Sequence, residues 1–226
     1  MNILVIFTGG TIGTIEKNGY LSTDESTRYT LLNKYKENGG DAKFTISSPY
    51  TVLSENLSSI ELNILQKEIE ANLNADYDGI IVTHGTDTLQ YTACALEYSF
   101  SNSPIPIVLV SSAYPLTNPK ANGYINFEAA IEFIKSKLSS GVFVSYKNEN
   151  DASVNIHIPS KILQHAELSS DLYSIDNKPY AIYNGKIEIN DTEYLPQNAL
   201  GAIEYTNNSD ILVISAHPGD NYNYSL

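Results

Sequence analysis

Residues 3 to 7 of this chain, Ile-Leu-Val-Ile-Phe, form an uninterrupted apolar run that ends in a turn rich in glycine and threonine. Such a run predicts a strand buried on both faces, as in a parallel sheet covered by helices. A second run, 79–83, ends in His84-Gly-Thr-Asp-Thr88. Open α/β sheets bind ligands at the carboxyl ends of their strands. Two strands that both end in glycine and threonine therefore indicate one site built from both ends.

Helical patterns alternate with further strand patterns along the first two thirds of the chain. Residues 58–61, Ser-Ser-Ile-Glu, match a capping box that opens a helix. The expected helices are 28–38, 58–73, 87–100 and 124–138, and the expected strands are 2–8, 44–47, 50–53, 79–83, 107–111 and 142–146. Successive strand–helix–strand units imply parallel pairing with right-handed crossovers.

From Asn148 onward the pattern changes to short alternating segments separated by turn residues. The expected strands there are 154–158, 181–183, 186–189 and 211–215. Asn184-Gly185 is a strong hairpin signal, and Lys17-Asn18-Gly19 predicts a second hairpin near the amino terminus that would act as a flap. The expected fold class is α/β: an open, mostly parallel sheet with flanking helices and a hairpin-rich C-terminal third.

The charge of the chain limits its partners. The net charge is −13 and the isoelectric point is near 4.6, so phosphate backbones and anionic membranes are repelled. A single cysteine, Cys94, excludes an internal disulfide. The sequence begins in a strand pattern without a basic leader, and no apolar run is long enough to span a bilayer, so we expect a cytoplasmic protein. The histidines have no metal-ligand spacing, and we expect no metal site.

The polar residues at the predicted strand ends allow several interpretations. The 8–13 turn could bind a nucleotide, although its spacing fits neither a dinucleotide fingerprint nor a P-loop; it could be structural; or it could hold a hydroxyl nucleophile. Thr86 or Asp87 could cap the following helix or face a site. His84 could be a general base or a packed structural residue. Taken singly, Lys161 reads as a surface lysine.

Taken together, residues 8–13, Thr-Gly-Gly-Thr-Ile-Gly, and 84–88, His-Gly-Thr-Asp-Thr, resemble the two signature motifs of bacterial-type L-asparaginases and glutaminase-asparaginases. The resemblance extends over residues 2–220. It implies an asparaginase-like N-terminal catalytic domain at 1–200 and the truncated start of a C-terminal domain at 201–226.

The resemblance also implies catalytic roles. Thr11 matches the threonine nucleophile, and Tyr20 matches the mobile-loop tyrosine that activates it. Thr86, Asp87 and Lys161 match a hydroxyl–amine–carboxylate relay in which the lysine is the base. The implied reaction forms an acyl-threonine ester, releases ammonia and needs no cofactor.

Substrate binding is implied for four residues. Ser54 and Glu55, with Thr86 and Asp87, match the groups that hold the carboxylate and ammonium of the substrate amino acid. The implied substrate is L-asparagine, and Glu55 keeps glutamine open. Family sites lie between subunits, so a homo-oligomer is expected. The alternative is a catalytically impaired member that binds an amino acid without turnover or is inactive alone.

Overall fold

The computed structural model describes residues 1–226 apart from 11, 13, 18–19, 24–25, 165–168, 195–197, 202, 208–217 and 220–226. For 14–17, 20–23 and 26–28 it describes the backbone alone. The expected strand at 211–215 lies outside the described residues, as does Thr11.

The described chain is built around an eight-stranded sheet with the order β10-β9-β8-β7-β6-β5-β1-β4. Its strands are β1 (Asn2–Phe7), β4 (Lys43–Ser47), β5 (Gly79–Thr83), β6 (Pro106–Val110), β7 (Gly141–Tyr146), β8 (Val154–His157), β9 (Ala181–Tyr183) and β10 (Ile187–Ile189). Strands β4, β1, β5, β6 and β7 are parallel, and β8, β9 and β10 follow in antiparallel pairing. The expected mostly parallel sheet with a hairpin-rich C-terminal third is confirmed.

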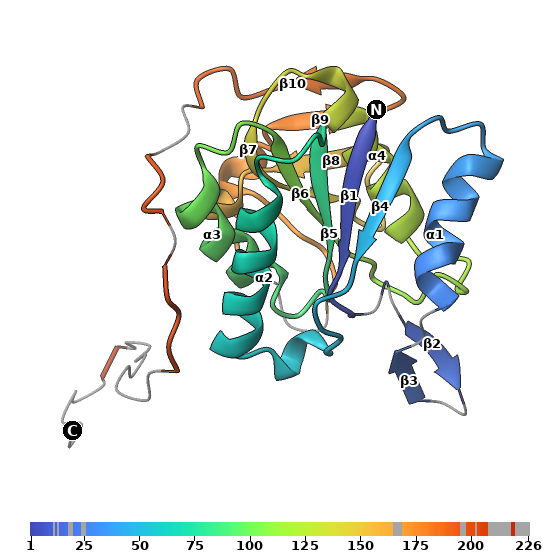
Figure 1. The fold of residues 1–226 in the computed structure, drawn as a ribbon, viewed down its shortest axis with the longest axis horizontal. Helices are drawn as coiled ribbons and strands as arrows, with labels where there is room; N and C mark the ends of the chain where they lie inside the picture. The colour runs from blue at the N-terminus through green and yellow to red at the C-terminus, as the bar shows by residue number, and fades with distance from the viewer. Residues whose placement is uncertain are drawn as a thin grey trace.

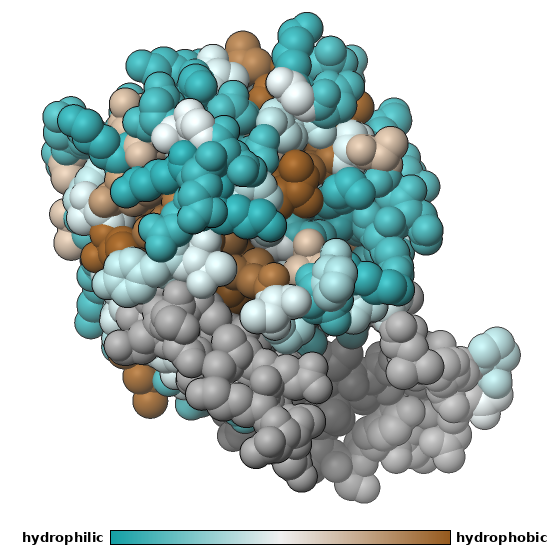
Figure 2. Space-filling model, turned by 90° about the vertical axis from the view of Figure 1, so that its right-hand side faces the viewer, coloured by the Kyte–Doolittle hydropathy of each residue, from teal (hydrophilic) through white to brown (hydrophobic). Residues whose placement is uncertain are grey.

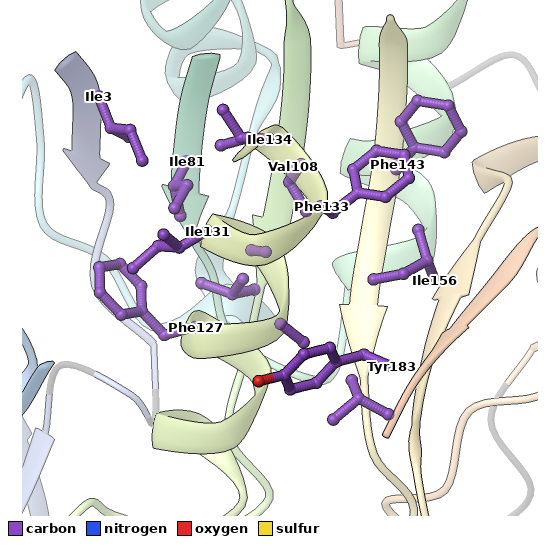
Figure 3. Packing of buried hydrophobic residues seen from close by; sticks show 14 of the residues in the cluster. Ile3, Ile81, Val108, Phe127, Ile131, Phe133, Ile134, Phe143, Ile156 and Tyr183 are labelled. Carbon is purple, nitrogen blue, oxygen red and sulfur yellow. The ribbon is translucent and has the colours of Figure 1, made fainter. Parts of the chain in front are cut away.

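Helices cover both faces of the sheet (Figure 1). They are α1 (Ser26–Glu37), α2 (Ser59–Asn72), α3 (Leu89–Phe100) and α4 (Gly123–Ser136). Alternate residues of β1 enter opposite cores: Ile3 and Val5 pack with α1 and α4, whereas Leu4 and Ile6 pack with α2 and α3. Figure 3 shows the first of these cores, in which Phe127 and Phe133 of α4 point toward the strands. Burial of both faces explains why these strands have continuous apolar runs.

The start of α2 and two hairpins are found where the cap and turn residues of the sequence predict them. Ser58 and Glu61 form the expected capping box at the start of α2. The hairpin at Asn184-Gly185 joins β9 to β10. Near the amino terminus, β2 (Thr14–Lys17) pairs with β3 (Tyr20–Thr23) in a separate two-stranded sheet, so the second expected hairpin is also confirmed.

The expected strand at 50–53 is wrong. Only Val52 lies beside the end of β1, in an isolated bridge with Gly9. The segment is too short to extend the pairing, because Pro49 has no backbone N–H and the chain turns into the short 3-10 helix η2 (Ser54–Asn56) directly afterwards. The segment therefore serves to bring η2 to the end of β1.

Hydrophilic residues dominate the side of the molecule seen in Figure 2, as the acidic composition suggests. Apolar residues are scattered among them in separate patches. Among the described residues, no helix is long and apolar enough to cross a membrane.

Candidate active site

Three loops meet at the carboxyl edge of the parallel strands: 8–10 after β1, 52–56 including η2, and 84–88 after β5. The backbone of Val52 joins the first two loops, since its N–H donates to Thr8 O at 3.0 Å and its carbonyl accepts from Gly10 N at 3.1 Å. The hydroxyl of Thr8 donates to Thr83 O at 2.6 Å and joins the first loop to the third. The loops of both signature motifs therefore form one assembly with η2.

Glycine makes this close approach possible. Gly10 has φ +73°, and a Cβ placed on it would lie 2.2 Å from Gly85 N. A Cβ on Gly85 would lie 2.3 Å from the hydroxyl oxygen of Ser54. A side chain at either position would collide with backbone or with the Ser54 side chain. Gly10 and Gly85 are thus required because the two loops that carry them are in contact.

Thr88 connects the loop after β5 to η2. Its hydroxyl donates to Ser54 O at 3.0 Å. Thr88 is also the N-cap residue of α3, although its side chain makes no capping hydrogen bond. The interpretation of Thr86 or Asp87 as the helix cap is therefore wrong, because both precede the cap and the chain has not yet entered the helix.

Ser54 and Asp87 lie together in this assembly. The hydroxyl of Ser54 is within 3.5 Å of Asp87 Oδ2, at the long limit of a hydrogen bond. Ser54 is buried, Thr86 is half-buried and Asp87 is exposed. Glu55, next to Ser54 in η2, is also exposed. The edge thus carries two carboxylates that are accessible to a ligand.

The two residues predicted to start the reaction are only partly described. Thr11 lies outside the described residues, but its neighbour Gly10 is in contact with Gly85, the residue before Thr86. Tyr20 is described by its backbone alone, which pairs in β3 opposite Lys17. Their roles remain predictions.

The structure places Lys161 near Asp191 and away from Thr86 and Asp87, so it does not bring together the three residues of the predicted relay. Its amine donates to Asp191 Oδ2 at 2.7 Å, and its side chain is 40% exposed. The neighbouring Ser160 N–H donates to the carboxylate of Glu97, well along α3 from Asp87.

The cause of this displacement is the direction of β8. His157 pairs with Val144 in antiparallel register, so β8 runs toward the amino ends of the parallel strands. The short helix η3 (Pro159–Lys161) follows β8 and therefore lies toward the edge opposite the candidate site.

His84 is a packed structural residue. It is 1% exposed, and its Nδ1 shares a 2.8 Å hydrogen bond with Gly85 O. Burial lowers the pKa of the His84 imidazole. The ring is therefore neutral and enclosed, which supports the structural interpretation over that of a general base.

Asn126, which the sequence interpretation missed, fixes the neighbouring strand ends. Its side-chain amide donates to Ser111 O at 2.9 Å and accepts from Lys147 N at 2.8 Å, which ties the ends of β6 and β7 to α4. It is fully buried in a helix face that is otherwise mostly apolar. A polar amide in such a face was the signal available in the sequence.

The fold and the site define a class of protein: an open α/β domain that presents hydroxyl groups and two accessible carboxylates at the carboxyl edge of its parallel strands. Such groups suit a small ligand with an ammonium group. No cluster of three or more histidine, cysteine or acidic residues that could hold a metal ion occurs in the described part of the chain.

The family model "Asparaginase, N-terminal" matches residues 2–194, and the chain belongs to this family. Among curated relatives, a glutamyl-tRNA(Gln) amidotransferase subunit of Methanosphaera stadtmanae is 29% identical over 225 residues, covering 96% of this chain and 51% of that protein. The L-asparaginase of Thermococcus kodakarensis is 31% identical over 160 residues, covering 66% of this chain and 45% of that protein. The chain thus spans about half the length of these relatives.

Solved structures agree on the fold. The L-asparaginase of T. kodakarensis superposes with a TM-score of 0.72 at 26% identity, covering 89% of this chain and 59% of that one. L-asparaginase I of Vibrio cholerae superposes with a TM-score of 0.76 at 23% identity, covering 97% of this chain and 65% of that one. The expected asparaginase N-terminal architecture is confirmed.

Proposed function

We propose that this chain carries the nucleophile and the amino-acid-binding groups of an amidohydrolase that converts L-asparagine to L-aspartate and ammonia. The observation that supports it most is the contact of Gly10 with Gly85 and of Gly85 with Ser54. It joins the loop that leads into Thr11 to the loop that leads into Thr86. Members of the asparaginase family are amidohydrolases, and the substrate assignment is our proposal.

Substrate binding would use the groups that the three loops bring together. The carboxylates of Asp87 and Glu55 would pair with the substrate ammonium, and the Ser54 hydroxyl would donate to its carboxylate. Fixing both ends of the amino acid would hold the side-chain amide in place, which replaces a bimolecular encounter by a positioned one.

The reaction would proceed in two steps. The hydroxyl oxygen of Thr11 attacks the side-chain amide carbon, Tyr20 takes the proton from that hydroxyl, and the amide nitrogen leaves as ammonia after it gains a proton. Water then hydrolyses the acyl-threonine ester, which gives L-aspartate and restores the threonine. Backbone N–H groups near Thr86 would stabilise the oxyanion. Lys161 has no part in this scheme.

A second candidate is an amidotransferase component that uses glutamine. Several curated relatives are glutamyl-tRNA(Gln) amidotransferase subunits, and one of them aligns with 96% of this chain. Glu55 is compatible with either amide. The net charge of −13 disfavours a direct tRNA contact by this part of the protein, so such a role would involve partner proteins. For the amidohydrolase that acts on L-asparagine, we propose a homo-oligomer, as the family resemblance implies.

Ammonia release from L-asparagine and L-glutamine by the purified chain tests the proposal. We expect release by the wild type and none above background in Thr11→Ala, with an unfolding midpoint close to that of the wild type, because only a hydroxyl and a methyl group are changed. Unchanged release in Thr11→Ala would refute the nucleophile. A folded wild type that binds L-aspartate without releasing ammonia would leave the non-catalytic alternative, which the position of Lys161 favours.

A further inference from the structure

Residues 198–201 and 203–207, which follow the sheet in the chain, run beside α3 and α2 from the amino-end edge of the parallel strands to their carboxyl edge (Figure 1). We call this segment the strap. It begins with Leu200 N–H donating to Tyr98 O at 2.8 Å near the end of α3. It ends with the side-chain oxygen of Asn207 accepting from Ser59 N at 3.3 Å in the first turn of α2. Ser59 is three residues beyond η2.

Asn63 and Tyr205 join the strap to α2 through two hydrogen bonds. The side-chain amide of Asn63 accepts from Tyr205 N at 2.9 Å and donates to Tyr205 O at 2.8 Å. One amide therefore satisfies both backbone groups of Tyr205, as a neighbouring β-strand would. Asn63 is partly exposed on α2, and both of these hydrogen bonds reach outside the helix.

The phenol of Tyr205 makes a second attachment. Its hydroxyl donates to Ala95 O at 2.7 Å and lies 3.2 Å from the hydroxyl of Ser99. The Ser99 hydroxyl in turn donates to the buried Gln66 at 2.9 Å. The ring is half-buried, and burial raises the pKa of the phenol. Tyr205 therefore bridges α3 to α2.

We propose that Asn63 and Tyr205 are positioning residues: they fasten the strap, and the strap fixes the first turn of α2 and, through it, the η2 turn with Ser54 and Glu55. The path is short and continuous. Asn207 holds Ser59, the capping box of Ser58 holds the same turn, and η2 lies directly before that box. The strap also fixes where the chain after Asn207 starts, at the edge of the sheet that carries the candidate site.

Amide hydrogen exchange on the full chain tests this. In Asn63→Ala we expect exchange at 203–207 and at 54–59 to rise about tenfold, as the loss of two hydrogen bonds of ordinary net strength predicts. The matched control is Asn72→Ala on the same helix, because the Asn72 side-chain amide donates to Glu68 of α2 itself and, among the described residues, has no hydrogen bond to the strap. Tyr205→Phe, which keeps the ring and removes the hydroxyl, should give a smaller rise in the same two segments.

The inference also predicts a change in kinetics. This kinetic test rests on the proposed function, whereas the exchange test does not. Asn63→Ala should raise the KM for the amide substrate, or weaken L-aspartate binding, by about tenfold with kcat within about twofold, because binding groups move while the nucleophile stays. Faster exchange at 203–207 with 54–59 and KM unchanged would overturn the inference, as would equal exchange in Asn63→Ala and Asn72→Ala. Absence of turnover in the wild type would count against the proposed function and leave the exchange result intact.

Discussion

Gly10→Ala will lower the unfolding free energy by about 3 kcal/mol or more and abolish ligand binding. The added Cβ would lie 2.2 Å from Gly85 N and 2.4 Å from Gly85 Cα, both backbone atoms that cannot move aside like a flexible side chain. A positive φ of +73° adds about 1 to 2 kcal/mol for any residue with a Cβ. The two signature loops must then separate, and separation destroys the site.

Gly39→Ala is the matched control for this prediction. Gly39 also has a positive φ, +87°, but a Cβ there would meet nothing within 4 Å. The unfolding free energy of Gly39→Ala, measured by urea denaturation, should fall by about 1 to 2 kcal/mol, because only the cost of a positive φ for a residue with a Cβ applies. Equal losses in the two variants would show that the loops at Gly10 and Gly85 do not press together.

Acidification from pH 7 to pH 5 will lower the unfolding free energy by about 2 kcal/mol through His157 alone. His157 is 2% exposed on β8, and burial lowers the pKa of its imidazole to about 4. The ordinary pKa is near 6.5, so below that pH the unfolded chain binds a proton that the folded chain does not. Stability is full above about pH 6.5 and falls until the pH reaches about 4.

The measurement is urea denaturation at pH 7 and at pH 5 for the wild type and for His157→Asn, which removes the titrating ring and keeps a polar partner for Ser174. Burial of His84 also lowers the unfolding free energy on acidification, but it does so in both proteins, so this contribution cancels in the comparison. The pH-dependent loss should be about 2 kcal/mol smaller in His157→Asn. An equal loss in both proteins would contradict a buried neutral His157.

Much of the fold follows from local signals in the sequence. The apolar runs at Asn2–Phe7 and Gly79–Thr83 predict buried parallel strands, because a strand covered on both faces has no polar alternation. Ser58 with Glu61 predicts the start of α2, and Asn184-Gly185 predicts the last hairpin, because each signal is completed within a few residues.

Features that depend on contacts far apart in sequence could not be predicted in this way. The direction of β8, and with it the position of Lys161, depends on which neighbour β8 pairs with after the turn that follows β7. The start of α3 at Leu89 is set by Thr88, whose hydroxyl bonds η2 rather than its own helix. The glycines of the two motifs were visible, but their purpose, contact with one another, is a property of the assembled sheet edge.

The central claim is that an amino acid binds where the three loops meet and that Lys161 lies outside this site. Calorimetric titration with L-aspartate tests it most directly, with Asp87→Asn and Lys161→Met compared with the wild type. We expect Asp87→Asn to weaken binding at least tenfold, since a charged hydrogen bond to the ammonium is lost, and Lys161→Met to leave the affinity within about twofold. Full affinity in Asp87→Asn together with lost affinity in Lys161→Met would contradict the account.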